Sequence, residues 1–259
     1  NDRLDAVLRL IAVAEHSIQM FFYMFADDSV GRDVRSALVE AAKRGVQVQL
    51  IIDSFGSAAI SDRFFDELTD AGGRYHCFST RKGLGYIIRN HQKILIADGK
   101  HALVGGFNIT DQYFGRAGDE DWEDLGIIIT GPEVPRLARY FDEMAGASVG
   151  GKVRYRKIRS IIQQWRPGIG EIQWLLGGPT NRISPWALTF KRSLEVGKRF
   201  DIASAYFSPS QTILRRLAKV SKRNKGSRLV MAGKTDNGTT IAAARLLYRY
   251  LLRRRAKIY

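Results

Sequence analysis

Alternation of strand-like and helix-like segments is the feature of this sequence that most restricts its fold. Apolar runs rich in strand-forming residues predict strands over 17–25, 46–52 and 74–78. The apolar spacing between these runs predicts helices over 31–44 and 62–71. This rhythm is typical of α/β proteins. We therefore predict an α/β fold with a mixed, largely parallel sheet that is flanked by helices.

The same alternation returns later in the chain. Phe200–Phe207 resembles Ile18–Phe25 at an offset of 182 residues, from 18 to 200. Gly226–Gly233 resembles Gly45–Ile52 at an offset of 181 residues, from 45 to 226. Two matches at nearly one offset predict two pseudo-symmetric repeats. The predicted parts are a first repeat at 1–145, a basic connector at 146–170 and an incomplete second repeat at 171–259.

Charge is distributed unevenly between the two halves. Up to Gly150 there are 16 Lys and Arg against 22 Asp and Glu, a net charge of −6. From Gly151 onward there are 25 Lys and Arg against 4 Asp and Glu, a net charge of +21. Such a basic half predicts an anionic partner, which is either a membrane surface or a nucleic acid.

The ends and the cysteine content add three expectations. Cys77 is the only cysteine, so no disulfide can form within the chain, which fits a reducing compartment. The sequence contains no run of about 18 apolar residues, so it predicts no membrane span. The sequence starts at Asn1 within a predicted helix and stops at Tyr259 within a predicted strand, so we expect a fragment.

A hairpin between two apolar runs carries the strongest functional signal. Asp98 and Gly99 predict its two-residue turn. The residue numbers of two cross-strand partners would then add up to 197, as 98 and 99 do. This places His91 opposite Gly106. Because strand side chains alternate, His91 and Lys93 would point to one face of the hairpin.

The residues around this histidine suit phosphodiester cleavage. Asn108 can join the same face, and Gly105 and Gly106 would leave room for a phosphate beside the imidazole. A neutral imidazole can attack phosphorus, while the Lys93 ammonium and an amide donor stabilise the phosphate oxygens. The histidines lack metal-ligand spacing, so we expect chemistry without a metal or cofactor.

The motif His91-x-Lys93-x4-Asp98, followed by Gly105-Gly106-x-Asn108, resembles the signature of the phospholipase D superfamily. The surrounding sequence is most similar to bacterial cardiolipin synthases and their phospholipase-D-like relatives. The supporting segments are FFYMFADD, LIIDSFGS, Asp121–Leu125 and Thr130–Pro132. The resemblance covers nearly the whole chain.

The resemblance implies a role for each motif residue. His91 would be the nucleophile that forms a phosphohistidine, and Lys93 and Asn108 would bind phosphate. Asp124 matches the carboxylate that holds Nδ1 of this histidine, whereas the turn position of Asp98 predicts a structural role. The family has a second such motif, which the repeat offset places near position 273, beyond Tyr259. We therefore expect the chain to be inactive alone unless two copies meet.

These expectations lead to one main hypothesis and two alternatives. The main hypothesis is a phosphatidyltransferase or phospholipase that acts on a phospholipid and an alcohol acceptor, held peripherally on the cytoplasmic side of an anionic membrane. The first alternative is an endonuclease with the same fold, although basic residues interleaved with stacking aromatics are not evident. The second alternative is a non-catalytic lipid-binding module.

Overall fold

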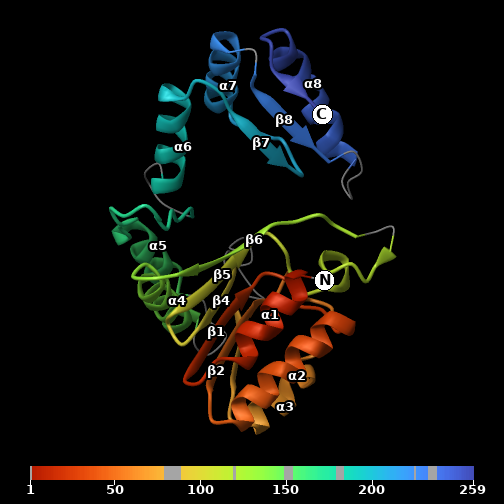
Figure 1. The fold of residues 1–259 in the computed structure, drawn as a ribbon, viewed down its shortest axis with the longest axis vertical. Helices are drawn as coiled ribbons and strands as arrows, with labels where there is room; N and C mark the ends of the chain where they lie inside the picture. The colour runs from red at the N-terminus through yellow and green to blue at the C-terminus, as the bar shows by residue number, and fades with distance from the viewer. Residues whose placement is uncertain are drawn as a thin grey trace. The chain divides into compact units, whose positions relative to one another are not determined.

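The computed structural model describes residues 2–78, 89–118, 121–148, 154–178, 184–224, 226–232 and 238–259. The chain divides into two compact units, Asn1–Trp174 and Leu175–Tyr259 (Figure 1). Each unit has its own hydrophobic core. Among the described residues, no helix combines the length and the apolar character needed to cross a bilayer.

A six-stranded mixed sheet forms the centre of the first unit, with the order β3-β2-β1-β4-β5-β6. Its strands are β1 Ser17–Phe22, β2 Gln47–Asp53, β3 Arg74–Phe78, β4 Lys93–Ala97, β5 His101–Gly105 and β6 Gly126–Thr130. β1, β2 and β3 pair in parallel, whereas β4 pairs antiparallel with β1 and with β5, and β6 antiparallel with β5. The predicted α/β class with a mixed sheet is therefore confirmed.

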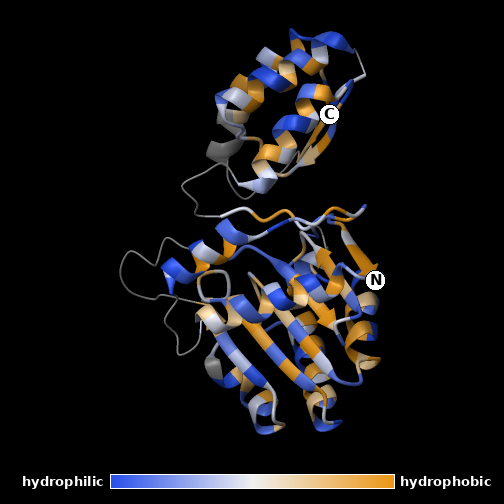
Figure 2. Cartoon of the chain, turned by 90° about the vertical axis from the view of Figure 1, so that its left-hand side faces the viewer, coloured by the Kyte–Doolittle hydropathy of each residue, from blue (hydrophilic) through white to orange (hydrophobic). Residues whose placement is uncertain are grey.

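Helices cover both faces of this sheet. The helices of this unit are α1 Asp2–Ala12, α2 Ser29–Lys43, α3 Asp66–Asp70, α4 Val134–Ser148 and α5 Tyr155–Gln164, with the 3-10 turns η1 Asp62–Phe65 and η3 Asp111–Tyr113. Side chains alternate along β1: Met20 and Phe22 join the core under α1 and α2, while Phe21 packs edge-on against Phe141 of α4 at 6.4 Å between ring centroids. Figure 2 shows hydrophobic and hydrophilic residues interspersed along the helices, as expected for helices that bury one face.

Capping explains where the longest predicted helix begins. α2 begins at Ser29, two residues before the predicted start, because the Asp28 carboxylate accepts a hydrogen bond from the Gly31 amide at 2.9 Å. The second oxygen of Asp28 accepts the Asp111 amide at 2.8 Å. One side chain therefore caps α2 and also holds the segment that follows β5.

The β4–β5 hairpin forms at the predicted turn but in a different register. Asp98 and Gly99 have positive φ angles of 54° and 63°, as the predicted turn requires. However, Ala97 pairs with His101, so that paired positions sum to 198 and the predicted sum of 197 is wrong. Lys100 has no cross-strand partner between β4 and β5. This extra residue shifts the register of the hairpin by one residue.

Gly105 and Gly126 pair across β5 and β6, and both accommodate the ring of Phe107. A Cβ atom at Gly105 would lie 2.7 Å from the Phe107 ring, and one at Gly126 would lie 2.6 Å from it. Phe107 is buried. The space at Gly105 is therefore filled by Phe107, which corrects the prediction that this glycine leaves room for a phosphate.

We expect Gly105→Ala to destabilise the protein by about 1–3 kcal/mol, because a buried aromatic ring must move to admit the methyl group. Urea unfolding of the two proteins measures this difference. Gly177→Ala is the matched control, because a Cβ at Gly177 meets no atom within 4 Å. An equal effect of the two substitutions would show that the Phe107 contact does not constrain position 105.

The predicted connector at 146–170 contains ordered structure. Within it, α5 packs on α4 and buries Ile158, Ile161 and Ile162, while residues 149–153 lie outside the described residues. Trp165, just after α5, stacks edge-on with Tyr140 of α4 at 5.5 Å. This part of the segment is thus built into the first unit by apolar contacts.

The second unit contains a three-stranded parallel sheet in the order β7-β8-β9. Its elements are α6 Pro185–Val196, β7 Asp201–Ser204, α7 Gln211–Arg223, β8 Arg228–Met231, α8 Gly238–Leu252 and β9 Lys257–Ile258. The order β7-α7-β8-α8-β9 follows the same parallel strand–helix succession as β1-α2-β2-α3-β3. This agreement supports the duplication, which remains a prediction.

Candidate active site

All candidate residues except Asp98 gather at one edge of the first sheet. Parallel strands β1 and β2 end there, at Phe22 and Asp53, and antiparallel β4 begins there at Lys93, which pairs with Phe22. β5 ends and β6 begins at the same edge, where Gly105 pairs with Gly126. The carboxyl ends of parallel strands are where open α/β sheets bind ligands.

His91 and Lys93 are in direct contact. The Lys93 Nζ lies 2.9 Å from His91 Nδ1 and 3.4 Å from Nε2, and it donates to the His91 backbone carbonyl at 2.8 Å. His91 is exposed, whereas Lys93 is buried with 3% of its surface accessible. The structure therefore brings a solvent-facing imidazole and a desolvated ammonium together, as the strand alternation predicts.

Burial changes the titration of both groups. It lowers the pKa of Lys93 to about 8, even though Asp124 and Asp53 favour the charged form. Burial also lowers the pKa of His91, and the neighbouring Lys93 charge lowers it further. At neutral pH the imidazole is therefore uncharged, as a nucleophile must be, and the ammonium is still largely protonated.

Tyr23, just after β1, forms the aromatic wall of this pair. Its ring centroid lies 4.4 Å from that of His91, and the Lys93 Nζ lies 5.2 Å from it. The pKa of Tyr23 is raised by burial and by the Asp53 carboxylate. The ring limits the positions that the imidazole can take and supplies a cation–π partner for Lys93.

Asp53 is a buried carboxylate at the end of β2. It accepts hydrogen bonds from the amides of Phe55 and Asn90, both at 3.0 Å. Burial raises its pKa, while these donors partly offset that effect. Since Asn90 immediately precedes His91, Asp53 fixes the backbone from which the imidazole projects, and its charge stabilises the Lys93 ammonium.

Asp124 lies over Gly106. A Cβ atom on this glycine would come within 2.4 Å of an Asp124 oxygen, so the carboxylate occupies the space predicted for a phosphate. One Asp124 oxygen accepts the Leu125 amide at 2.7 Å. In this structure the group at His91 Nδ1 is Lys93, and the contact of Asp124 with this nitrogen stays a prediction. Asp124 acts on the site through its charge, which raises the pKa of Lys93.

The side-chain amide of Asn108 forms hydrogen bonds within the protein. Its Oδ1 accepts the Met24 amide at 3.1 Å, and its Nδ2 donates to the Tyr113 hydroxyl at 3.1 Å. Asn108 is buried, with 3% of its surface accessible. In this arrangement it ties the segment after β5 to the segment after β1, which differs from the predicted phosphate contact.

Asp98 lies at the other end of the hairpin. Its carboxylate accepts the backbone amides of Glu15, His16 and Ser17 at 2.7–3.0 Å. Burial opposes its ionisation, but these three donors outweigh that effect and lower its pKa. This geometry fits the structural role expected for Asp98, because the side chain anchors the turn to the segment between α1 and β1.

Comparison with known families identifies the domain. The family model described as "Cardiolipin synthase, PLD-like domain" matches residues 7–145, which is more than half of the chain. The chain belongs to this family. The match includes every residue of the His-Lys motif and the strands that carry it.

Curated relatives of this PLD-like domain are bacterial cardiolipin synthases. Cardiolipin synthase B of Shigella flexneri is 28% identical over 98% of the chain, and cardiolipin synthase 2 of Bacillus anthracis is 31% identical over all of it. The chain spans 63% and 52% of these relatives. Phosphatidylserine synthase of Haemophilus influenzae Rd KW20, 15% identical, has the same fold with a TM-score of 0.71, over 97% of this chain and 66% of that one.

Two residues of the PLD-like domain's site were not among the sequence predictions. Tyr23 and Asp53 lie in segments that already carried the family resemblance, FFYMFADD and LIIDSFGS. Asp53 directly follows the predicted strand 46–52, which is the available signal for a ligand-binding edge, whereas Tyr23 lies within the predicted strand 17–25. Their packing on the His-Lys pair depends on the pairing of β1 with both β2 and β4, which the sequence pattern does not specify.

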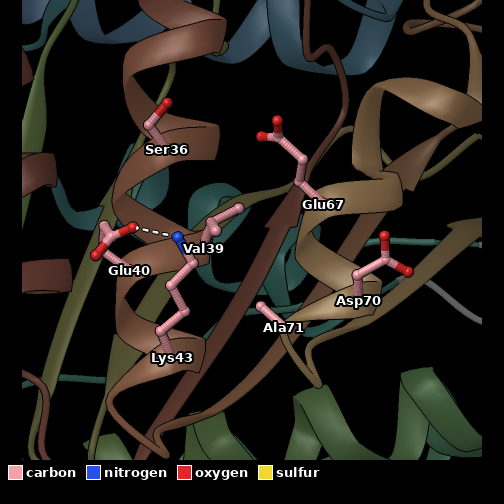
Figure 3. Close-up of a pocket in the computed structure, with 7 residues that line it drawn as sticks. All are labelled: Ser36, Val39, Glu40, Lys43, Glu67, Asp70 and Ala71. Carbon is pink, nitrogen blue, oxygen red and sulfur yellow. Dashed lines mark hydrogen bonds and ion pairs between the residues drawn. The ribbon is translucent and has the colours of Figure 1, made fainter.

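A separate surface depression lies between α2 and α3 (Figure 3). Its lining residues are Ser36, Val39, Glu40, Lys43, Glu67, Asp70 and Ala71. Lys43 is paired with Glu40 at 2.8 Å, and Glu67 with Arg35 at 3.4 Å. This depression includes no residue of the His-Lys site, and its charges are those of a solvated helix surface.

Proposed function

We propose that this chain supplies one half of the active site of a phospholipid phosphatidyltransferase or hydrolase of the cardiolipin synthase type. The observation that carries the proposal is the contact between the Lys93 ammonium and the exposed His91 imidazole at the ligand-binding edge of the sheet. Membership of the PLD-like domain family supports a phosphodiester as the substrate.

The proposed reaction has two balanced steps. A ring nitrogen of His91 attacks the phosphorus of a phosphatidyl group, and the bond from phosphorus to the first alcohol oxygen breaks. The leaving oxygen takes a proton from a general acid, which we assign to a second His-Lys motif. That acid, now a base, removes a proton from the acceptor hydroxyl, whose oxygen displaces His91 from phosphorus.

Lys93 has to change partners before this attack. In the present geometry its ammonium lies within hydrogen-bond distance of a His91 ring nitrogen, whose lone pair is thereby engaged. A phosphate bound at the site offers anionic oxygens, which attract the ammonium more strongly than a neutral imidazole does. Substrate binding would therefore free the nucleophilic lone pair at the moment when the phosphate is neutralised.

The setting that we propose is a peripheral position on the cytoplasmic side of an anionic membrane. The net charge of +21 beyond Gly150 supports it, because anionic headgroups attract such a segment. The same charge also suits a nucleic acid, so the endonuclease remains the second candidate. A non-catalytic lipid-binding module would retain the fold and bind lipid without turnover.

Mass spectrometry of lipid products separates these functions. The full-length protein is incubated with phosphatidylglycerol vesicles, and in parallel with a supercoiled plasmid. We expect cardiolipin from transfer or phosphatidic acid from hydrolysis, with the plasmid intact. Plasmid nicking without either lipid would overturn the lipid assignment, and binding of vesicles without turnover would support the non-catalytic module.

The proposed roles predict a bell-shaped pH profile of kcat/KM. Activity rises as His91 loses its proton, at a pH below 6.5 because the pKa of His91 is lowered. It falls as Lys93 loses its proton, near the pKa of about 8. Rates measured from about pH 5 to pH 10 test both limbs. An alkaline limb that persists unchanged in Lys93→Met would assign it to another group.

A further inference from the structure

The outward face of α8 combines arginine with exposed leucine. Leu246 and Leu252 have 76% and 51% of their surface accessible. Arg245 and Arg249 of α8 are exposed as well, and so is Arg253, which directly follows the helix and continues its last turn through a hydrogen bond to the Arg249 carbonyl. At 100° per residue these five positions fall on one side of the helix, opposite the buried Ala244 and Leu251, which belong to the core of the second unit. We call these five residues the α8 stripe.

The charge of the α8 stripe is not neutralised by the described residues of its unit. The acidic side chains described there are Glu195 and Asp201, and they pair with other arginines. Glu195 contacts Arg216 at 2.7 Å, and Asp201 contacts Arg228 at 2.7 Å. The stripe therefore offers unpaired positive charge to an external anion, as far as the described residues extend.

Arg254, which follows Arg253 in the sequence, does not belong to the α8 stripe. Arg254 lies 3.5 Å above the Tyr250 ring and donates to the Tyr250 carbonyl at 2.9 Å. Its side chain is therefore held against its own unit. By contrast, the α8 stripe presents its cations and its leucines to solvent together.

A second basic helix in the same unit provides a comparison. α7 exposes Arg215, Lys219 and Lys222, but its leucines Leu214 and Leu217 are buried. Phosphate backbones of nucleic acids would be attracted by either helix. Exposed leucines gain nothing from a phosphate backbone, but they gain free energy when they enter the acyl boundary of a bilayer. The chemistry of the stripe thus favours a lipid surface over a nucleic acid.

We propose that the α8 stripe is the surface by which the second unit docks on an anionic bilayer. The arginines contact the headgroups, and Leu246 and Leu252 enter the interface between headgroups and acyl chains. This inference rests on the proposed function, because a phospholipid substrate requires the protein to reach a membrane. It adds to that function which surface contacts the membrane, the α8 stripe, and which side chains make the contact, arginines with headgroups and leucines with the acyl boundary.

Vesicle co-sedimentation of full-length variants tests the proposal. The probe is a vesicle of phosphatidylcholine and phosphatidylserine at roughly 3:1, with pure phosphatidylcholine as the neutral reference. Three variants are compared: a charge variant of the stripe (Arg245→Gln, Arg249→Gln, Arg253→Gln), its leucine variant (Leu246→Ser, Leu252→Ser), and a matched α7 variant (Arg215→Gln, Lys219→Gln, Lys222→Gln). All carry His91→Ala so that lipid is not consumed.

We expect the charge variant of the stripe to bind anionic vesicles about 100-fold more weakly, from about 1 kcal/mol for each arginine at the surface. The leucine variant should lose about tenfold, and this loss should persist at high salt because it is not electrostatic. The α7 variant, which removes the same charge, should lose less than about fivefold.

Three outcomes would overturn the proposal. Equal losses in the two charge variants would indicate general electrostatic attraction without a docking face. Unchanged vesicle binding of the leucine variant together with a lower melting temperature would show that protein covers the stripe. A larger loss of plasmid binding than of vesicle binding would indicate nucleic acid. Turnover of phosphatidylglycerol in detergent micelles by the same variants with His91 restored reports on the proposed function separately.

Discussion

Replacing His91 with alanine is expected to lower the rate of lipid product formation by roughly 10⁵-fold, because it removes the imidazole that would form the proposed phosphohistidine. His91 is exposed, so its loss should leave the melting temperature unchanged. Product formation from phosphatidylglycerol by the full-length protein measures the effect, and circular dichroism measures the fold.

His101→Ala is the matched control for this substitution. His101 lies on β5 of the same sheet, at the turn end of the hairpin, away from the edge that carries Lys93. Turnover should be preserved in this variant. Comparable losses in the two histidine variants would mean that the fold of the hairpin, and not the imidazole of His91, limits activity.

Lys93→Met is expected to lower kcat/KM by about 10³-fold, because it removes a desolvated cation from the position where phosphate charge develops. The variant should also raise the pKa of His91, since the Lys93 charge contributes to lowering it. Steady-state kinetics give the first quantity, and NMR titration of the imidazole gives the second. The two readouts together distinguish an electrostatic role from a loss of packing.

Lys100→Met provides the comparison for this second prediction. Lys100 belongs to the same hairpin but is exposed at its turn. Neither the rate nor the titration of His91 should change in this variant. An unchanged titration of His91 in Lys93→Met would contradict the contact between Lys93 and the imidazole that the structure shows.

The pattern of the sequence was sufficient for the class of fold and for the pairing of His91 with Lys93. The predicted strand 74–78 coincides with β3, and the turn at Asp98 and Gly99 forms as expected. These features depend on local properties, namely side-chain alternation, helix spacing and turn chemistry. Each of them is readable from neighbouring residues.

Features that depend on contacts between distant residues could not be predicted in this way. The register of the hairpin depends on one extra residue at Lys100, which the turn signal alone does not reveal. Asn108 forms hydrogen bonds with Met24 and Tyr113, and Asp124 lies against Gly106. The spacing of these residues in the sequence does not predict either contact. The wall formed by Tyr23 requires β1 to lie next to β4.

The anchoring of Asp98 has a consequence for how this unit folds. Its three hydrogen bonds join residues that are 81 to 83 positions apart, and they complete the corner beside β1. Contacts of such separation form late, because a long loop must close before they are gained. We therefore expect the parallel strands β1, β2 and β3 to associate first, and the motif-bearing hairpin to dock last. The nucleophile would then acquire its surroundings only in the final stage of folding.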